Sequence, residues 1–289
     1  MDSQATKPPF VNFDFSGASD TGRRRDSNQD QFLIAQLQKV MRVEKSSLDF
    51  GAPTICGDFM GTLMFVADGI GGAPAGDVAS RIAIQEVCRF VLNSMHWLHS
   101  EDPYPSEEFV QDLIAAFERT HRVVRNNAAS HFDRIGMGTT LTLGYIVWPN
   151  LYVVHVGDSR CYHLHQNELI RITTDQTIGQ SLCEKGILKP DEVDESRFGH
   201  MLWSCIGAVE NPTAVIYQRR LAAGDVVLLC SDGVTRHLAD GQLHDLMSSS
   251  LTCEEICDLI VRQCNEAGGE DNITVALTRC TEKIVKGTS

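Results

Sequence analysis

The sequence predicts an α+β fold in which helices cover antiparallel sheets. Runs rich in β-branched residues are expected as strands at residues 63–67, 141–147, 151–156, 161–165, 226–230 and 273–278. Turn residues at Pro149-Asn150 and Gln166-Asn167 separate neighbouring runs, so hairpins are expected there, the second with a strand at 169–172. Consecutive hairpins indicate antiparallel pairing and exclude the alternating strands and helices of a doubly wound fold.

Three segments have the apolar spacing of helices that pack on one face. Residues 77–94 carry a broad apolar face, and Ser106 can cap a second helix. A third helix is expected after Thr252, because Thr252 and Glu255 fit a capping box and Gly268 offers a stop. These helices do not alternate with single strands along the chain, which favours an arrangement in which helices cover the faces of sheets.

The ten cysteines are expected to be reduced thiols, mostly in apolar segments. Cys253, Cys257 and Cys264 fall on one face of the third helix, so core packing explains their spacing better than a zinc site does. Unpaired thiols favour a reducing compartment, and we expect the protein in the cytoplasm.

Length and composition fit one domain with loose ends. The chain has 289 residues, of which 43% are apolar, and this is ample material for a core. Residues 1–13 are expected to form a flexible arm, 14–281 a single domain and 282–289 a tail. Residues 44–61 and 100–106 are predicted as loops within that domain.

Charge and hydropathy exclude two classes of partner. The 38 acidic and 25 basic residues give a net charge of −13, so a sequence-independent grip on nucleic acid is not expected. No apolar run approaches the ~20 residues of a membrane span, and the first ten residues do not resemble a secretory signal. No membrane partner is therefore expected.

Four aspartates stand at the edges of apolar strand runs: Asp68, Asp158, Asp232 and Asp271. A buried carboxylate is costly unless it is paired, hydrogen-bonded or bound to a cation. Together with Asp30, these acids would repel one another if the strand ends converged, and a divalent metal would relieve the repulsion. An all-oxygen ligand set selects Mg²⁺ or Mn²⁺ rather than zinc. Two such ions lower the pKa of a bridging water and support displacement at phosphorus.

Neighbouring residues fit the same site. Gly69 follows Asp68 and could offer its carbonyl to an ion, because a glycine lets the backbone come close to a ligand. Arg25, five residues before Asp30, is the candidate for binding the substrate phosphate. The alternative for Arg25 is a solvated basic cluster with its two arginine neighbours. Asp20 is expected only to brace a turn.

In these segments the sequence resembles the metal-dependent PP2C (PPM) protein serine/threonine phosphatases, most closely their bacterial type. Six segments follow the family's order: residues 19–30, 66–72, 138–140, 155–160, 230–233 and 271–275. The resemblance implies an α-β-β-α sandwich of two antiparallel sheets flanked by helices, with the metal site at one end. It also implies hydrolysis of phosphomonoesters on proteins by a metal-activated water.

The resemblance implies a role for each acid. Asp68 would bridge two core ions, Mn²⁺ or Mg²⁺, and Gly69 would add a carbonyl. Asp232 and Asp271 would complete the shell of one ion, and Asp30 would hold metal-bound water. Asp68 and an arginine are thus the expected catalytic residues.

The resemblance identifies Arg25 as the catalytic arginine, and Arg25 would bind the substrate phosphate. Asp158 with Asp232 could bind the third ion of bacterial-type members, and residues 173–205 would form a mobile flap. The implied partners are proteins phosphorylated on serine or threonine, among them kinase substrates or the kinase itself. A monomer is expected.

Two positions depart from the family pattern. Gln29 replaces the usual glutamate of the opening motif, which could weaken one ion's hold. Ala73 replaces a histidine proposed to protonate the leaving alkoxide, so we expect good turnover of aryl phosphates and slower turnover of phosphoserine. His155 is no obvious substitute, because it lies inside a predicted strand and is expected to be a buried structural residue.

Two other functions fit less well. Residues 157–159 resemble the nucleophile block of GDS-type esterases, but that block is central here and Asp240 and His244 have the wrong spacing for the partner pair. A phosphatase-like module that binds phosphoproteins without turnover is the remaining alternative. Degenerate relatives usually lose metal aspartates, whereas this chain keeps five.

Overall fold

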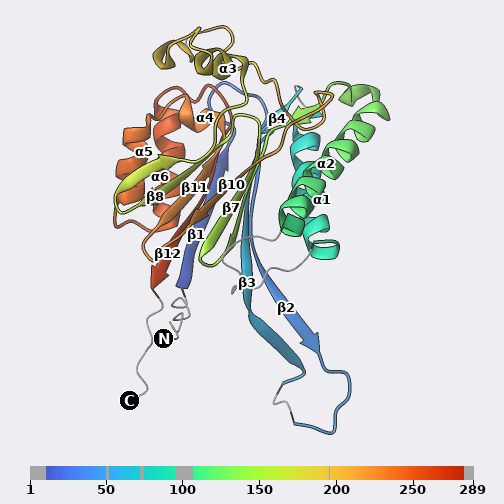
Figure 1. Cartoon of the computed structure of the whole chain (residues 1–289). Coiled ribbons are helices and arrows are strands. Elements are labelled where there is room, and N and C mark those ends of the chain that lie inside the picture. The colour runs from blue at the N-terminus through green and yellow to red at the C-terminus, as the bar shows by residue number, and fades with distance from the viewer. Residues whose placement is uncertain (1–10, 50–51, 72–74, 96–106, 195, 283–289) are drawn as a thin grey trace.

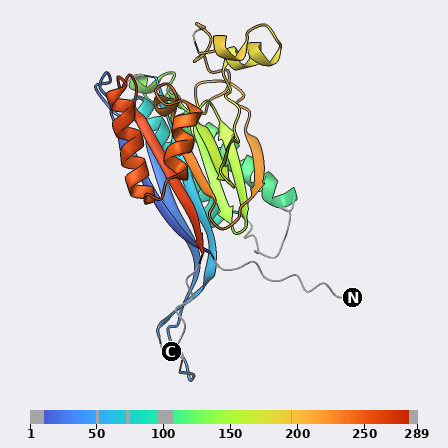
Figure 2. The ribbon, with the colours of Figure 1, turned by 90° about the vertical axis from the view of Figure 1, so that its left-hand side faces the viewer.

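Two antiparallel sheets lie face to face at the centre of the molecule, and helices cover their outer faces (Figures 1 and 2). The computed structural model describes residues 11–49, 52–71, 75–95, 107–194 and 196–282. The first sheet has the strand order β1 (Val11–Asp20), β12 (Ile273–Glu282), β11 (Val226–Cys230), β8 (Arg160–His165) and β9 (Glu168–Arg171). The second has the order β10 (Val215–Arg220), β7 (Asn150–Val156), β6 (Leu141–Val147), β3 (Thr54–Ala67) and β2 (Gln31–Arg42).

The helices complete the layers. On the outer side of the second sheet lie α1 (Ala75–Asn93) and α2 (Glu107–Ala129), and on that of the first lie α5 (Asp240–Ser248) and α6 (Cys253–Glu266). The short helices α3 (Ile178–Glu184) and α4 (Asp232–Thr235) lie toward one end of the sandwich (Figure 1). The predicted α+β class, with two antiparallel sheets flanked by helices, is confirmed.

Burial on both faces explains the continuous apolar runs of the central strands. In β7, Tyr152 and Val154 join the core beneath α1 and α2, whereas Leu151 and Val153 join the core between the sheets. A third core lies between the first sheet and α5 and α6. Because every residue of β6 and β7 is buried, neither strand shows the alternating pattern of a sheet with one wet face.

The predicted hairpins are present, and some strands, above all β3 and β12, are longer than expected. Strands β6 and β11 have the predicted bounds, and β8 and β9 are joined by Gln166 and Asn167, both with positive φ. Residues 54–61, which the sequence predicts as loop, instead extend β3, which pairs with β2 far beyond the body of the molecule (Figure 1). Pairing with β2 holds this extension, and residues 54–57 are exposed or partly exposed, so they need no apolar pattern.

The chain ends and one predicted cap fall partly outside the described residues. Strand β1 begins at Val11 and pairs with β12 along its whole length, so it includes residues 11–13. Residues 1–10 and 283–289, Ser106 and the predicted loop at 100–106 lie outside the described part of the chain.

The predicted capping box begins α6. The Thr252 hydroxyl accepts a hydrogen bond from the Glu255 amide at 3.2 Å, and the Thr252 amide donates to the Glu255 carboxylate at 2.8 Å. Cys253, Cys257 and Cys264 are all buried in the core beneath this helix, which confirms packing rather than metal binding. All ten cysteines are unpaired. Among the described helices, none combines the length and apolar content needed to cross a bilayer.

Candidate metal centre

The strand ends bring five acids to one end of the sandwich. Asp30 precedes β2, and the other four follow β3, follow β7, begin α4 and precede β12: Asp68, Asp158, Asp232 and Asp271. These last four line a cleft of about 690 Å³ that we call the acidic cleft. Asp30 lies beneath it, with 3% of its surface exposed. The structure therefore places together all the acids that the sequence singled out.

Backbone contacts from a neighbouring strand fix Asp68. Its carbonyl accepts hydrogen bonds from the Thr140 amide at 2.8 Å and the Thr139 hydroxyl at 2.9 Å, and its amide donates to the Thr140 hydroxyl at 3.0 Å. The short strand β4 (Gly69–Ile70) then pairs with β5 (Gly138–Thr139). The Gly-Thr-Thr segment at 138–140 thus holds the main chain on both sides of the carboxylate.

Gly69 is required by close packing at the same point. A Cβ built on Gly69 would lie 2.3 Å from the Gly76 carbonyl oxygen and 2.8 Å from that of Gln29. Both atoms belong to backbone that cannot yield cheaply, so a larger residue would push α1 or the Asp30 loop away from the site. The absence of a side chain also leaves the Gly69 carbonyl unobstructed.

Asn272 anchors the loop that carries Arg25. Its side-chain amide donates to the Thr21 carbonyl at 2.9 Å and the Ser27 carbonyl at 3.0 Å, and its oxygen accepts from the Gln29 amide at 2.9 Å. Within this loop, Arg25 forms a bidentate pair with Asp271, with Nε to Oδ1 at 2.7 Å and Nη2 to Oδ2 at 2.8 Å.

Asp158 is placed by a hydrogen-bonded turn. The Gly157 amide donates to the Gln176 side chain at 3.0 Å, and the Gln176 amide donates back to the Gly157 carbonyl at 2.7 Å. Beside it, Arg160 holds Asp175 in a pair with Nη2 to Oδ2 at 2.7 Å. These contacts tie the start of the 173–205 segment to the strand end that carries Asp158.

Burial and mutual repulsion disfavour ionisation of the acids. Burial raises the pKa of Asp30 to about 7, and the charges of Asp232 and Asp271 add to the rise. The pKa of Asp68 is raised well above its ordinary value, first by burial and then by the charge of Asp30. Burial likewise raises the pKa of Asp158, with the charge of Asp232 as the next cause.

The oxygen atoms available here suit hard divalent cations. Oδ1 of Asp232 is buried without a hydrogen-bond partner among the described residues, and the equally buried carboxylate of Asp30 has only the side chains of Ser231 and Thr274 to stabilise its charge. A buried carboxylate oxygen left in this state is costly, and a cation is the partner that would satisfy several of them at once. Asp30, Asp68, Asp158, Asp232 and Asp271 therefore fit Mn²⁺ or Mg²⁺, which prefer oxygen ligands.

Two cleft residues were missed by the sequence reasoning. Arg236 lies one helical turn after Asp232 and contacts its Oδ2 through Nε at 2.9 Å, and its Nη2 lies 3.9 Å from Oδ2 of Asp271. Its spacing of four residues from an assigned acid was the available signal. His200 comes from the 173–205 segment and lies near Asp158 and Asp232, with one potential ligand atom of each within 4.8 Å of the others. Nothing local in the sequence marks it.

Two residues kept off the ligand set have structural partners. Asp20 accepts hydrogen bonds from the Gly22 amide at 2.8 Å and the Asn265 side chain at 3.0 Å, as expected of a turn brace. His155 is fully buried in β7, and its Nδ1 lies 2.9 Å from the Thr142 hydroxyl. Burial lowers the pKa of His155 to about 4, so it is a neutral core residue. Ala73 lies outside the described residues.

Comparison with known proteins points to one family. A family model for protein phosphatase 2C matches residues 54–277. The serine/threonine phosphatase Stp of Listeria welshimeri is 34% identical over 218 residues, which cover 74% of this chain and 83% of that protein. The serine/threonine protein phosphatase PstP of Mycobacterium tuberculosis is 32% identical over 216 residues, which cover 74% of this chain and 40% of PstP.

Solved structures of serine/threonine phosphatases are also similar to this chain. The crystal structure of PstP from Mycobacterium tuberculosis has a TM-score of 0.74 at 26% identity, covering 94% of this chain and 100% of that one. The catalytic domain of PstP in complex with two manganese ions has a TM-score of 0.72 at 26% identity, with the same coverage. A serine/threonine phosphatase of S. agalactiae has a TM-score of 0.74 at 26% identity, covering 93% of this chain and 99% of that one.

Proposed function

This chain belongs to the protein phosphatase 2C family of metal-dependent protein serine/threonine phosphatases, and we propose that the acidic cleft is where it hydrolyses phosphomonoesters. One observation carries the assignment. Five acids from distant parts of the chain meet at one end of the sandwich, where burial and mutual repulsion raise the pKa of Asp30, Asp68 and Asp158, and Oδ1 of Asp232 is buried with no partner among the described residues. Such an arrangement costs stability and is best explained by cations that the cleft holds in use.

The acids would hold the ions as follows. Asp68 would bridge two core ions and the Gly69 carbonyl would join one of them. Asp232 and Asp271 would complete one shell, and Asp30 would orient a water from below. When bound, the ions lower the pKa of water and neutralise charge on the phosphoryl group. The cofactor is Mn²⁺ or Mg²⁺, as the PstP domain with two manganese ions supports.

Arg25 would bind the substrate phosphate. Its side chain is 55% exposed, and its planar fork now grips both oxygens of Asp271. The same fork matches two oxygens of a phosphate. An ion that engages Asp271 would weaken this pair, which would leave the guanidinium free to turn toward the substrate.

A third ion and a flap complete the proposal. Asp158 and Asp232 would hold the third ion, and the nearby unpartnered Oδ1 of Asp232 supports this. Residues 173–205 would act as a flap beside the cleft, because His200, Leu202 and Cys205 from this segment line it.

The substrates are phosphorylated serine/threonine proteins. We propose that they include the substrates of an opposing kinase or that kinase itself, and that the enzyme works as a cytoplasmic monomer. Ten unpaired cysteines fit a reducing compartment.

The absence of a histidine at position 73 sets a preference among leaving groups. An aryl oxide leaves without protonation, whereas a serine alkoxide needs a proton donor. We therefore expect Ala73→His to accelerate hydrolysis of an alkyl phosphate more than that of p-nitrophenyl phosphate, by roughly tenfold or more. Steady-state kcat/KM values on both substrates measure this, and equal effects would contradict the proposal.

The decisive test is a metal titration of phosphatase activity. The purified chain should hydrolyse p-nitrophenyl phosphate and a phosphothreonine peptide only with Mn²⁺ or Mg²⁺, and EDTA should abolish turnover. Asp232→Asn should lower kcat/KM by ~10²-fold or more, because it removes charge where the transition state needs it. Asp133→Asn is the matched control, since the Asp133 side chain is 63% exposed and lies outside the cleft. Metal-dependent binding of the phosphopeptide without turnover would favour a phosphoprotein-binding module instead.

A further inference from the structure

A second group of metal-ligating side chains lies at the opposite end of β8 and β11 from the acidic cleft. His163 and His165 are two residues apart on β8, so both side chains lie on one face of the strand. Asp225 immediately precedes β11, which pairs with β8. We call these three residues the His–Asp cluster. Since β8 is six residues long, the cluster lies roughly 15–20 Å from Asp158.

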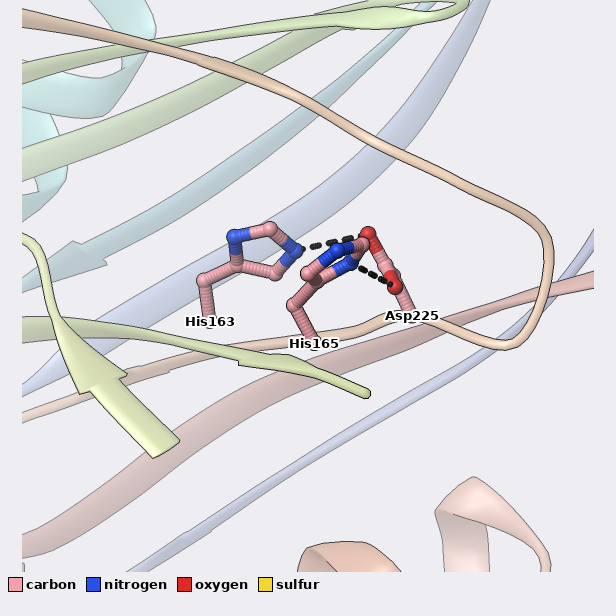
Figure 3. Close-up of side chains that lie close together, drawn as sticks. All are labelled: His163, His165 and Asp225. Atoms are coloured by element: carbon pink, nitrogen blue, oxygen red, sulfur yellow. Dashed lines mark hydrogen bonds and ion pairs between the residues drawn. The ribbon is translucent and has the colours of Figure 1, made fainter. Parts of the chain in front are cut away.

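The two imidazoles converge on one carboxylate (Figure 3). His163 Nε2 lies 2.8 Å from Oδ2 of Asp225, and His165 Nδ1 lies 2.8 Å from Oδ1. The ring centroids are 5.6 Å apart, and one potential ligand atom from each residue lies within 4.8 Å of the other two. The two ring nitrogens therefore face the two oxygens of one carboxylate, with potential ligand atoms of all three residues close together.

Burial gives these contacts a low-dielectric setting. The side chains of His163 and Asp225 are 3% and 4% exposed, while that of His165 is 34% exposed. Asp225 is thus a buried carboxylate that contacts two imidazoles and the Ala222 amide, which donates to Oδ2 at 2.8 Å. No lysine or arginine pairs with it among the described residues, so a divalent cation would supply positive charge that the site lacks.

We propose that the His–Asp cluster is a binding site for a divalent transition metal, with Zn²⁺ as the expected ion. Two imidazole nitrogens and a carboxylate oxygen are the ligand set that zinc accepts, and a solvent molecule would complete a tetrahedral shell at the exposed side of His165. The acidic cleft is dominated by carboxylate oxygens, with His200 as its one potential imidazole ligand among the described residues, so its five acids favour harder ions than the two imidazoles of the His–Asp cluster do.

The His–Asp cluster would have to open to admit the ion. Zinc–ligand distances of about 2.0–2.1 Å in a tetrahedron place neighbouring ligand atoms about 3.3 Å apart. The present distances of 2.8 Å join the two nitrogens to different oxygens of Asp225, so both would lengthen by about half an ångström and the side chains would turn until both nitrogens and one oxygen surround the ion. Each ring proton facing Asp225 would move to the other nitrogen of its ring. For His163 that atom is Nδ1, which is buried with no hydrogen-bond partner among the described residues, so the zinc bond must outweigh the cost of an N–H without an acceptor there.

The alternative is a purely structural hydrogen-bond network, and His165→Gln distinguishes the two. The Gln side-chain amide can still donate to Asp225, and position 165 is partly exposed, so this variant should fold. It lacks the imidazole nitrogen, so Zn²⁺ affinity should fall by at least roughly tenfold. His131→Gln is the matched control, because His131 is exposed and hydrogen-bonds only to a backbone carbonyl of its own segment.

The experiment is calorimetric titration of Zn²⁺ into protein preloaded with excess Mn²⁺, combined with anomalous diffraction at the zinc edge from crystals of the wild type. The expected result is an anomalous peak between His163, His165 and Asp225, with a binding event that His165→Gln loses and His131→Gln keeps. Zinc peaks confined to the acidic cleft, or equal Zn²⁺ binding by both variants and the wild type, would overturn the proposal. Mn²⁺-dependent phosphatase activity of His165→Gln, measured in parallel, keeps this outcome separate from the assignment of the cleft.

Discussion

At the scale of single residues, the acids that would bind metal ions lower the stability of the metal-free fold. Asp30 and Asp68 are buried among other carboxylates, and burial and repulsion raise the pKa of both. Without cations, the nearest compensation comes from arginines, since Arg25 grips Asp271 and Arg236 contacts Asp232. These arginines occupy carboxylate oxygens that ions would use, so guanidinium and metal compete for the same ligands.

This competition predicts the effect of removing Arg236. A positive charge about 4 Å from an ion's ligands opposes cation binding by a few kcal/mol at an intermediate effective dielectric, before screening. Arg236→Ala should therefore tighten Mn²⁺ binding, by roughly tenfold, as measured by calorimetry on metal-free protein. Arg262→Ala is the control, because Arg262 is 65% exposed and, within the part of the chain that the structure describes, pairs with Glu266 on α6 and not with an acid of the cleft. Weaker Mn²⁺ binding by Arg236→Ala would mean that Arg236 positions Asp232 rather than competing for it.

His155 gives a prediction for pH dependence. Its pKa is about 4 in the fold, below the ordinary 6.5, because burial disfavours the charged ring. The unfolded chain therefore binds a proton first as pH falls, so this residue's contribution to stability is complete above pH 6.5 and is lost progressively toward pH 4. The loss amounts to about 3 kcal/mol over that window.

The variant His155→Gln should reduce this loss. A Gln side chain can keep the contact with Thr142 but does not titrate. The free energy of urea unfolding, measured in EDTA at several pH values from 7 to 4.5, should fall less steeply for the variant than for the wild type. Comparing slopes removes any constant cost of repacking. Parallel slopes for the two proteins would show that His155 is not neutral in the fold.

The acids could be predicted because they stand at the ends of strands. The cleft residues that only the tertiary fold brings there could not be predicted. Each acid stands beside a recognisable apolar run, so its position could be derived from the sequence and the convergence from the resemblance. Arg236 and His200 have no such local mark, because their place in the cleft depends on a short helix and on a long segment that folds back. Sequence spacing alone does not report which side chains meet across a cleft.

At the scale of elements, burial decided which strands were predictable. Strands β6, β7 and β11 are buried throughout and stand out as apolar runs. Strand β10 lies at a sheet edge and carries the exposed Arg219 and Arg220, and β2 at the opposite edge is exposed over its last five residues. Edge strands depend on backbone pairing and tolerate polar side chains, so their sequences resemble loops.

Burial and capping residues also decided which helices could be predicted from the sequence. The capping box made the start of α6 predictable, and its amphipathic face places three cysteines in the core. Helix α5 was missed because only Leu243 and Met247 of its nine residues are buried, which gives too short an apolar pattern. The start of this helix is held by Gln242, whose side chain accepts from the Ala239 amide at 3.0 Å. The N-cap position is occupied by Ala239, which is not one of the residues that usually cap a helix, so the start of α5 could not be recognised from the sequence.

At the scale of the whole molecule, the sandwich has a functional end and a projecting arm. The paired strands β2 and β3 continue beyond the body, away from the end that carries α3 and α4 (Figure 1). With 14 residues in β3, the start of that strand lies roughly 45 Å from Asp68. Val40, Met41 and Leu48 on the projection are 60%, 53% and 68% exposed. Such side chains contribute little to the fold and are available to a partner.

Shortening this projection separates catalysis from partner choice. Val40 and Cys56 are partners in the β2–β3 ladder, so replacing residues 41–55 by Asn-Gly closes the hairpin in its native register. Among the described residues, no core cluster includes a residue from 38–62, so the melting temperature should stay within about 3 °C of the wild type. Turnover of p-nitrophenyl phosphate should be unchanged, because the small substrate reaches only the cleft. Rates on a panel of phosphorylated proteins should change in rank order if the exposed apolar residues contact protein substrates. A control with the projection intact and Lys45→Ala tests a general effect of surface charge, and an unaltered rank order in the shortened variant would exclude the projection from substrate selection.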